Sequence, residues 1–175
     1  MLTATVSGAT RTNTYDGLGR RVKVEVSGGG GTTYFVYGVD GELAAEYGSL
    51  AAGTAGRHYV TSDWLGSTRM VSDSSGALVA RRDYLPFGQF VDASIGGRGA
   101  SYSAAGPRQM FTGKERDAET GLDYFGARYM SSAQGRFMSP DKPFADQKPE
   151  DPQSWNLFSY VRNNPLRWVL GGICG

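Results

Sequence analysis

A short unit that recurs along the chain restricts its possible folds more than any other feature. Each copy has an acidic residue and a glycine at a turn, then alternating small and large apolar residues, then a tyrosine. The two clearer copies begin at Asp40 and Asp73, and residues 15–20 form a partial third copy. A unit of this size buries little apolar surface by itself. The sequence therefore predicts short strands that stack on their neighbours.

The spacing of apolar residues predicts where these strands lie. Val22, Val24 and Val26 alternate with charged residues, which is the period of a strand with one buried face. The glycines at 28–31 separate this run from residues 32–37, which are rich in β-formers, so a hairpin is expected here. Further strands are expected at residues 43–47, 58–61, 68–71, 77–84, 122–129 and 136–138, whereas residues 155–161 fit either a strand or a helical turn.

Composition supports a sheet made of tight turns. Glycine accounts for 26 of 175 residues, with ten tyrosines and eight phenylalanines. Glycine adopts the positive φ angles that tight turns require, and aromatic residues pack well on a pleated surface. We therefore expect an all-β fold of consecutive antiparallel hairpins that form a curved sheet. The expected parts are a poorly defined segment at 1–14, repeat hairpins at 15–91, a Gly/Ser/Ala-rich loop at 92–107, a core at 108–169 and an atypical tail at 170–175.

Charge and residue counts argue against several classes of function. The net charge is +1, from 18 basic and 17 acidic residues, so no nucleic-acid partner is expected. The doublets Arg20–Arg21 and Arg81–Arg82 are interpreted as part of a solvated face. Cys174 and His58 are single, which excludes a metal site built on several cysteines or histidines. No cofactor is expected.

Neither a membrane span nor a secretion signal is visible in the sequence. No stretch approaches the roughly 20 apolar residues that cross a bilayer. The N-terminal residues 1–6 lack the basic and apolar regions of a signal peptide. The chain is therefore expected either to stay inside the cell or to belong to a longer protein whose export signal lies elsewhere.

Six groups of residues, in order along the chain, resemble the motifs of the RHS repeat-associated core family, also called YD-repeat proteins. The resemblance covers roughly residues 13–169. The motifs are YDGLGRRV at 15–22, DWLGSTR at 63–69, YLPFG at 84–88, FTGKERD with TGLDYFGARY at 111–117 and 120–129, GRFMSPD at 135–141, and NLFSYVRNNP at 156–165.

The resemblance implies a structural role. In this family, repeated strands wind into a hollow β-sheet cocoon, the associated core closes one end, and a C-terminal segment, often a toxin, is held inside. Bacterial members serve in competition or in insecticidal toxin systems. The implied partners are upstream repeats and a C-terminal effector, and the implied location is secreted or on the cell surface. We expect this chain to be a wall segment of such a shell and not an enzyme.

In some family members the core is also an aspartic autoprotease, and this chain departs from their pattern. Asp141 corresponds to the first conserved acid, although Lys142 separates it from Pro143. After residues 167–169, where those members carry the second Asp, stands Leu170. Two carboxylates must share one proton in this chemistry, so we expect no autoproteolysis and interpret Asp141 as a remnant in a turn. The tail at 170–175 suggests a truncated gene product.

The aromatic residues leave a third function open, because they could stack against carbohydrate on a cell-surface module. Packing within a sheet is the simpler explanation. The residues concerned are Tyr34, Tyr37, Tyr47, Tyr59, Trp64, Tyr84, Tyr124 and Tyr129.

Overall fold

A computed structural model describes residues 2–6, 9–39, 43–48, 57–118, 120–145 and 147–166, and these form two compact units, Met1–Gly53 and Thr54–Gly175. Every strand pairing between named strands is antiparallel, and the helical elements are short 3-10 turns. The expected all-β fold of consecutive hairpins is confirmed. None of the helices in these residues is long and apolar enough to cross a membrane.

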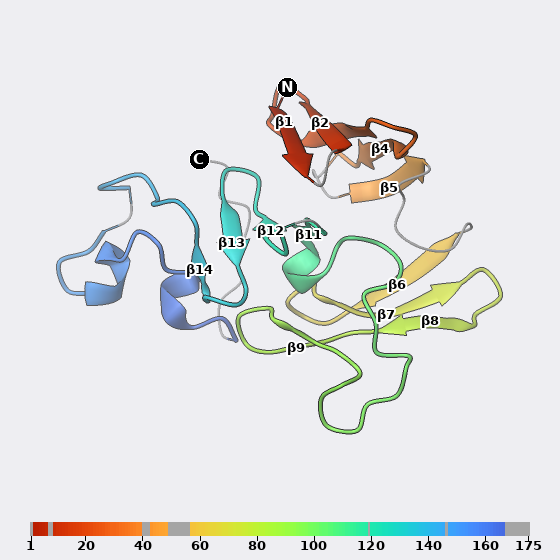
Figure 1. Cartoon of the computed structure of the whole chain (residues 1–175). Helices are drawn as coiled ribbons and strands as arrows, with labels where there is room; N and C mark the ends of the chain where they lie inside the picture. Colours follow the sequence, from red (N-terminus) through yellow and green to blue (C-terminus); the bar gives the residue numbers. More distant parts are fainter. Residues whose placement is uncertain are drawn as a thin grey trace. The chain divides into compact units, whose positions relative to one another are not determined.

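The first unit is a five-stranded sheet in which the strands follow their order in the sequence (Figure 1). The predicted hairpin around residues 28–31 is confirmed, since Lys23 to Val26 pair with Tyr34 to Gly31. The strands are β1 (Leu2–Val6), β2 (Ala9–Tyr15), β3 (Arg21–Val26), β4 (Gly31–Tyr37) and β5 (Leu43–Gly48).

The expectation that residues 1–14 form no defined element needs correction. Leu2 to Val6 pair in register with Asn13 to Ala9, and β2 pairs in turn with β3. The alternating threonines of β2 fit a pleated strand, but they are less apolar than the valines of β3. The sequence pattern was therefore too weak to predict a strand that its neighbours stabilise.

The two faces of this sheet differ in exposure. Val24 and Thr33, which lie directly opposite each other, are fully buried, and Phe35 is buried on the same face. On the other face Tyr34 and Tyr47 lie opposite each other and are both exposed. This alternation is what the period of two predicts for a half-buried sheet.

The second unit contains three sheets (Figure 1). The first is β6 (His58–Ser62), β7 (Thr68–Asp73) and β8 (Leu78–Arg81); the second is β9 (Asp83–Tyr84) and β10 (Phe90–Val91); the third is β11 (Glu115–Arg116), β12 (Asp123–Tyr124), β13 (Tyr129–Ser131) and β14 (Arg136–Phe137). The 3-10 turns are η1 (Phe111–Gly113), η2 (Pro152–Trp155) and η3 (Val161–Asn163).

These bounds correct one strand prediction and decide an open one. Residues 122–129 form two short strands rather than one, because Gly126 has a φ of 84° and the amide of Phe125 bonds to the carbonyl of Arg128. Residues 155–161 are not a continuous element. They run from η2 through one bridge, Ser159 with Arg136, to η3.

The same turn recurs after Asp16, Asp63 and Asp73. In each, one carboxylate oxygen accepts the amides two and four residues later, and the aspartate amide donates to the carbonyl four residues later. The residue three positions on is a glycine with φ between 76° and 82°. Its amide donates to the aspartate carbonyl. The repeat is thus a chain of Asp-capped hairpins. The predicted copy at Asp40 lies outside the described residues.

The core of the second unit is a cluster of apolar residues from the third sheet, from one segment before it and from one segment after it. Phe111, Met130, Phe137 and Tyr160 are all at most 2% exposed and pack together. The ring of Tyr160 lies 6.0 Å from those of Phe111 and Phe137. This cluster joins η1, β13, β14 and the residue before η3, and it is the framework on which the candidate site is built.

Candidate site around Asp141

Asp141 follows β14 at the point where the chain runs beside residue 157. Its amide donates to the carbonyl of Leu157 at 2.9 Å, and the amide of Phe137 donates to the carbonyl of Phe158 at 2.9 Å. These two bonds dock residues 157–158 against the edge of the third sheet. The core ring of Phe137 therefore sets the position of the Asp141 backbone.

A single cation holds the Asp141 side chain. The Nη2 atom of Arg128 lies 2.6 Å from its Oδ2 atom, and the amide of Lys142 donates to Oδ1 at 2.8 Å. The Arg128 guanidinium also stacks 3.8 Å from the centre of the Phe137 ring. Asp141 itself is 52% exposed. The carboxylate thus faces water on one side and a fixed arginine on the other.

This arrangement differs from the acid pair of an aspartic protease. The partners of the Asp141 carboxylate are the guanidinium of Arg128 and the amide of Lys142, whereas the acids of such a pair share one proton between two carboxylates. The position of Leu170 lies outside the described residues. Bonding of Asp141 to the amide of Lys142 agrees with the turn interpretation.

The sequence did not single out Arg128, although it is the residue that organises this site. It belongs to the motif at 120–129 and lies between β12 and β13, in a run rich in aromatic residues. An arginine in such a run predicts an acidic partner, since long cationic side chains are seldom buried unless paired. That signal was available without the structure.

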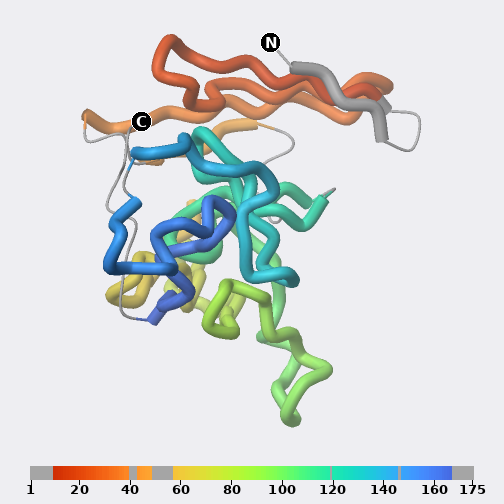
Figure 2. Tube along the Cα trace, turned by 90° about the vertical axis from the view of Figure 1, so that its left-hand side faces the viewer, coloured from red at the N-terminus to blue at the C-terminus, as the bar shows by residue number. Residues whose placement is uncertain are grey.

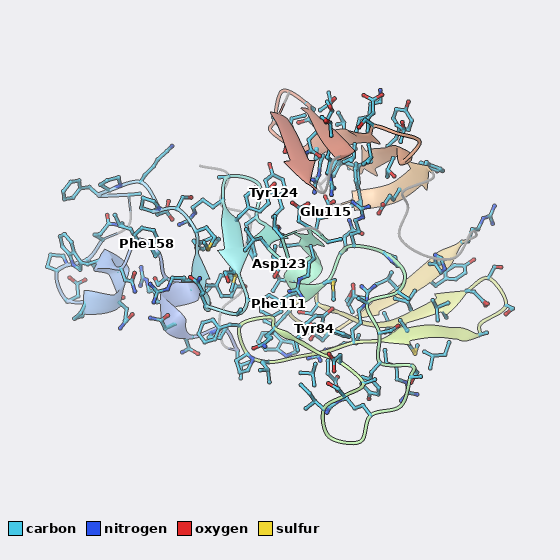
Figure 3. The ribbon with its side chains drawn as sticks, viewed as in Figure 1. Tyr84, Phe111, Glu115, Asp123, Tyr124 and Phe158 are labelled. Carbon is cyan, nitrogen blue, oxygen red and sulfur yellow. The ribbon has the colours of Figure 1, made fainter. Side chains whose placement is uncertain are left out.

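A second acidic group, deeper in the unit, is also paired with an arginine. Asp123 is fully buried and accepts two bonds from Arg116, at 2.8 Å from Nε and 2.7 Å from Nη2. Burial raises the pKa of the Asp123 carboxyl, and Arg116 acts in the opposite direction. Asp123 lies on β12, beside Tyr124 in the chain (Figure 3). The Asp123 side chain is fully buried and that of Arg116 is 14% exposed, so the pair is built as a structural tie.

An open cleft lies beside the core on the other side of β14. It has a volume of about 410 Å³, and its lining mixes apolar side chains with amides. The lining includes Leu85, Phe87, Gln134, Asn156, Phe158 and Asn163. Among the described residues no group of three or more His, Cys, Asp or Glu side chains is placed to hold a metal ion.

The candidate carbohydrate residues differ in exposure. Tyr34 and Tyr47 are exposed in the first unit, and Tyr59 and Trp64 are exposed in the second. Tyr84 packs at 6.0 Å against Phe111, and Tyr124 packs at 5.1 Å against Tyr129. Part of the set therefore serves packing, as the simpler explanation held, and sugar binding by the exposed members stays a prediction.

The arginine doublets are not a solvated face. Arg21 and Arg82 are both 1% exposed, whereas Arg81 is exposed. Side chains of neighbouring residues on extended backbone point to opposite sides. In each doublet one arginine side chain is therefore buried and the other is in contact with solvent. The interpretation from charge alone was wrong for one member of each pair.

Comparison with known proteins links this arrangement to a family. The Teneurin YD-shell model matches residues 28–166. A stretch of 109 residues is 37% identical to "Toxin subunit YenC1" of Yersinia entomophaga and covers 62% of this chain. A stretch of 166 residues is 30% identical to "tRNA3(Ser)-specific nuclease WapA" of Bacillus spizizenii and covers 93% of this chain.

Solved structures agree in fold. The crystal structure of TcdB2-TccC3 without the hypervariable C-terminal region aligns with 95% of this chain and 7% of that one, with a TM-score of 0.53 and 20% identity. The chain spans 10% of YenC1 and 6% of the WapA protein. The similarity thus concerns one section of much larger molecules.

Proposed function

Because the chain belongs to the Teneurin YD-shell family of RHS/YD-repeat proteins, we propose that it is a wall segment of a shell that encloses a C-terminal toxin or effector. The observation that supports the proposal is that each strand pairs antiparallel with a strand next to it in the sequence. From β4 to η3 the family match runs through consecutive short hairpins. Such hairpins make a wall when they stack on further repeats.

The names of two relatives are consistent with a shell that encloses a toxin. YenC1 is a toxin subunit, and WapA is a tRNA nuclease. Each is many times longer than this chain, so the cargo and the upstream repeats belong to the proposal. Most of the described chain is β-strand and turn. This composition suits a segment with a structural role.

A chimera tests the proposed role. The stretch of YenC1 that matches this chain is replaced by the corresponding residues of this chain, and added protease digests the chimera and the parent subunit. We expect equal protection of the C-terminal part in both. A matched chimera with Met130→Asp, which places a charge in the core, should lose that protection. A chimera that elutes like the parent but leaves its C-terminal part open to digestion would contradict the proposal.

We also propose that the segment does not cleave itself. The support is the Arg128 guanidinium 2.6 Å from Asp141, which occupies the side of the carboxylate that a second acid would need. Intact mass of the purified chain is followed over days at mildly acidic and neutral pH, beside an Asp141→Asn variant. Constant mass is expected for both chains. A defined cut in the parent chain that the variant abolishes would show a working protease.

A further inference from the structure

Residues 101–109, here called the strap, lie against the sheet of β6, β7 and β8. The stretch before them projects from the unit, as the green loop in Figure 2 shows. The strap begins beside β8. The amide of Arg81 donates to the carbonyl of Ser101 at 2.7 Å, and the amide of Ser103 donates to the carbonyl of Arg81 at 3.3 Å. These bonds form a parallel bridge between Arg81 and Tyr102, so the strap covers the outer edge of β8.

The far end of the strap is fixed to β7. The carbonyl of Gln109 accepts the hydroxyl of Thr68 at 2.8 Å, and the next carbonyl, that of Met110, accepts the amide of Thr68 at 3.0 Å. The strap therefore crosses from one strand of the sheet to another. The stretch 92–107, expected as a loop, contains no named strand, and its second half is packed on the sheet.

The middle of the strap surrounds the guanidinium of Arg82. Nη1 donates to the carbonyl of Gln109 at 3.0 Å, and Nη2 donates to those of Ala104, Ala105 and Pro107 at 3.2, 2.7 and 2.8 Å. All four acceptors belong to the strap, and none is a carboxylate. Arg82 is 1% exposed. A buried guanidinium is costly unless its donors are satisfied. Here the strap carbonyls satisfy both terminal nitrogens, whereas the Nε atom has no hydrogen-bond partner.

Gly106 brings the strap into contact with the sheet. Its φ is 92°, and a Cβ atom there would lie 3.1 Å from Cγ1 of Val71. Val71 and Ala80, on the covered face, are both fully buried. The close approach needs a residue without a side chain, so the glycine and the arginine together determine how the strap lies on the sheet.

We propose that Arg82 is a latch that holds the strap as a separable cover over the edge of β8 and over Val71. The position of the strap and the hydrogen bonds of Arg82 are coupled, because displacement of the strap removes every carbonyl acceptor of Arg82 at once. An open strap exposes the backbone of β8 at Arg81, and a bare edge of this kind pairs with another strand. The occupant of the open edge is the same edge of a second copy of this chain, because two identical open edges can pair with each other. This inference does not depend on the enclosed cargo.

The adjacent arginine supplies a matched control. Arg82→Met and Arg81→Met each remove one guanidinium at neighbouring positions, one buried and one exposed. Amide hydrogen exchange is measured by NMR in the full chain. In Arg82→Met the amides of residues 81 and 103 should exchange roughly tenfold faster, because their partners lie across the bridge to the strap, while that of Met70, which lies opposite Thr61 of β6, stays protected. In Arg81→Met all three should exchange as in the parent chain.

A second variant opens the strap while keeping Arg82. Gly106→Val introduces a clash with Val71 and a side chain that the positive φ disfavours, so the same amides should lose protection. The open variants should also elute at a larger size as concentration rises. Unchanged protection at residue 103 in Arg82→Met would overturn the latch. Loss of protection throughout β7 and β8 in both Arg82→Met and Gly106→Val would overturn the separable cover, because strap and sheet would then unfold as one element.

Discussion

Two buried charged residues of the second unit, Arg82 and Asp123, have different kinds of partner. Arg82 is surrounded by backbone carbonyls, whereas Asp123 is matched by the side chain of Arg116. The Arg116 guanidinium also donates to the carbonyl of Gly88 at 2.8 Å, which joins the third sheet to the turn before β10. In both cases the fold supplies directed acceptors or donors in place of water, and removal of one partner leaves an uncompensated charge.

Loss of Arg116 should therefore destabilise the chain strongly. Arg116→Met leaves the fully buried Asp123 without its partner, and the cost of such a change is about 3–5 kcal/mol in the free energy of unfolding. Urea unfolding measures it. Arg20→Met, which breaks a surface pair with Asp16, serves as the control and should change stability little. Equal effects in the two variants would contradict the buried role of Arg116.

The hydroxyl groups of Tyr84 and Tyr160 should lose their protons at a higher pH than an ordinary tyrosine does. Burial raises the pKa of Tyr84 and of Tyr160 to about 12 from the usual 10.0, against the lowering by Arg82 and by Thr112 respectively. Because the folded pKa is raised, each contributes stability that is complete below pH 10 and is lost as the pH rises towards 12. Absorbance at 295 nm should show a late phase that shrinks in Tyr160→Phe. A single phase near pH 10 in the folded chain would exclude these shifts.

At the scale of elements, the repeated unit is a turn whose hydrogen bonds are local. The aspartate carboxylate and the glycine three residues later satisfy the backbone of the turn locally. Local bonds of this kind can be read from the residues themselves, which is why most of the strands were predicted close to their bounds. The single strand expected at 122–129 failed because Gly126 sits inside an apolar run, where the sequence gives no other sign of a turn.

An alanine at Gly76 measures how much the backbone conformation of the turn contributes to stability. Gly76 has a φ of 82° and nothing within 4 Å of where a Cβ would lie, so Gly76→Ala should cost about 1–2 kcal/mol through conformation alone. Gly17→Ala is the matched control, since that position is equally open and does not have a positive φ in this range. Thermal unfolding compares the two variants. A loss as large at Gly17 as at Gly76 would contradict the argument.

At the scale of the whole molecule, the sheets differ in how their edges are covered. The edges of the third sheet are bridged by Gln109 and Ser159, and the strap covers β8. Among the described residues β6 pairs with a strand on one side only. Tyr59 and Val60 are exposed there, and residues 59–62 carry no charge. Edges of this kind associate with other strands.

We therefore expect the isolated chain to self-associate. A charged side chain on β6 should reduce this self-association. Val60→Lys should lower the average mass measured by light scattering at high concentration, because a buried lysine opposes strand pairing. Ile95→Lys adds the same charge in the exposed loop and should leave the mass unchanged. A parent chain that stays monomeric over the whole concentration range would contradict the expectation.

The sequence by itself determined the features that depend on neighbours within about five residues. These are the Asp-capped turns, the period of two in β3, the hairpin of β3 and β4, and the motifs that resemble the family. Only the tertiary structure decided what Arg81 and Arg82 do, or why Asp123 is buried while Asp141 is half exposed. The physical reason is that burial depends on partners far away in the chain: the acceptors of Arg82 lie 22 to 27 residues later.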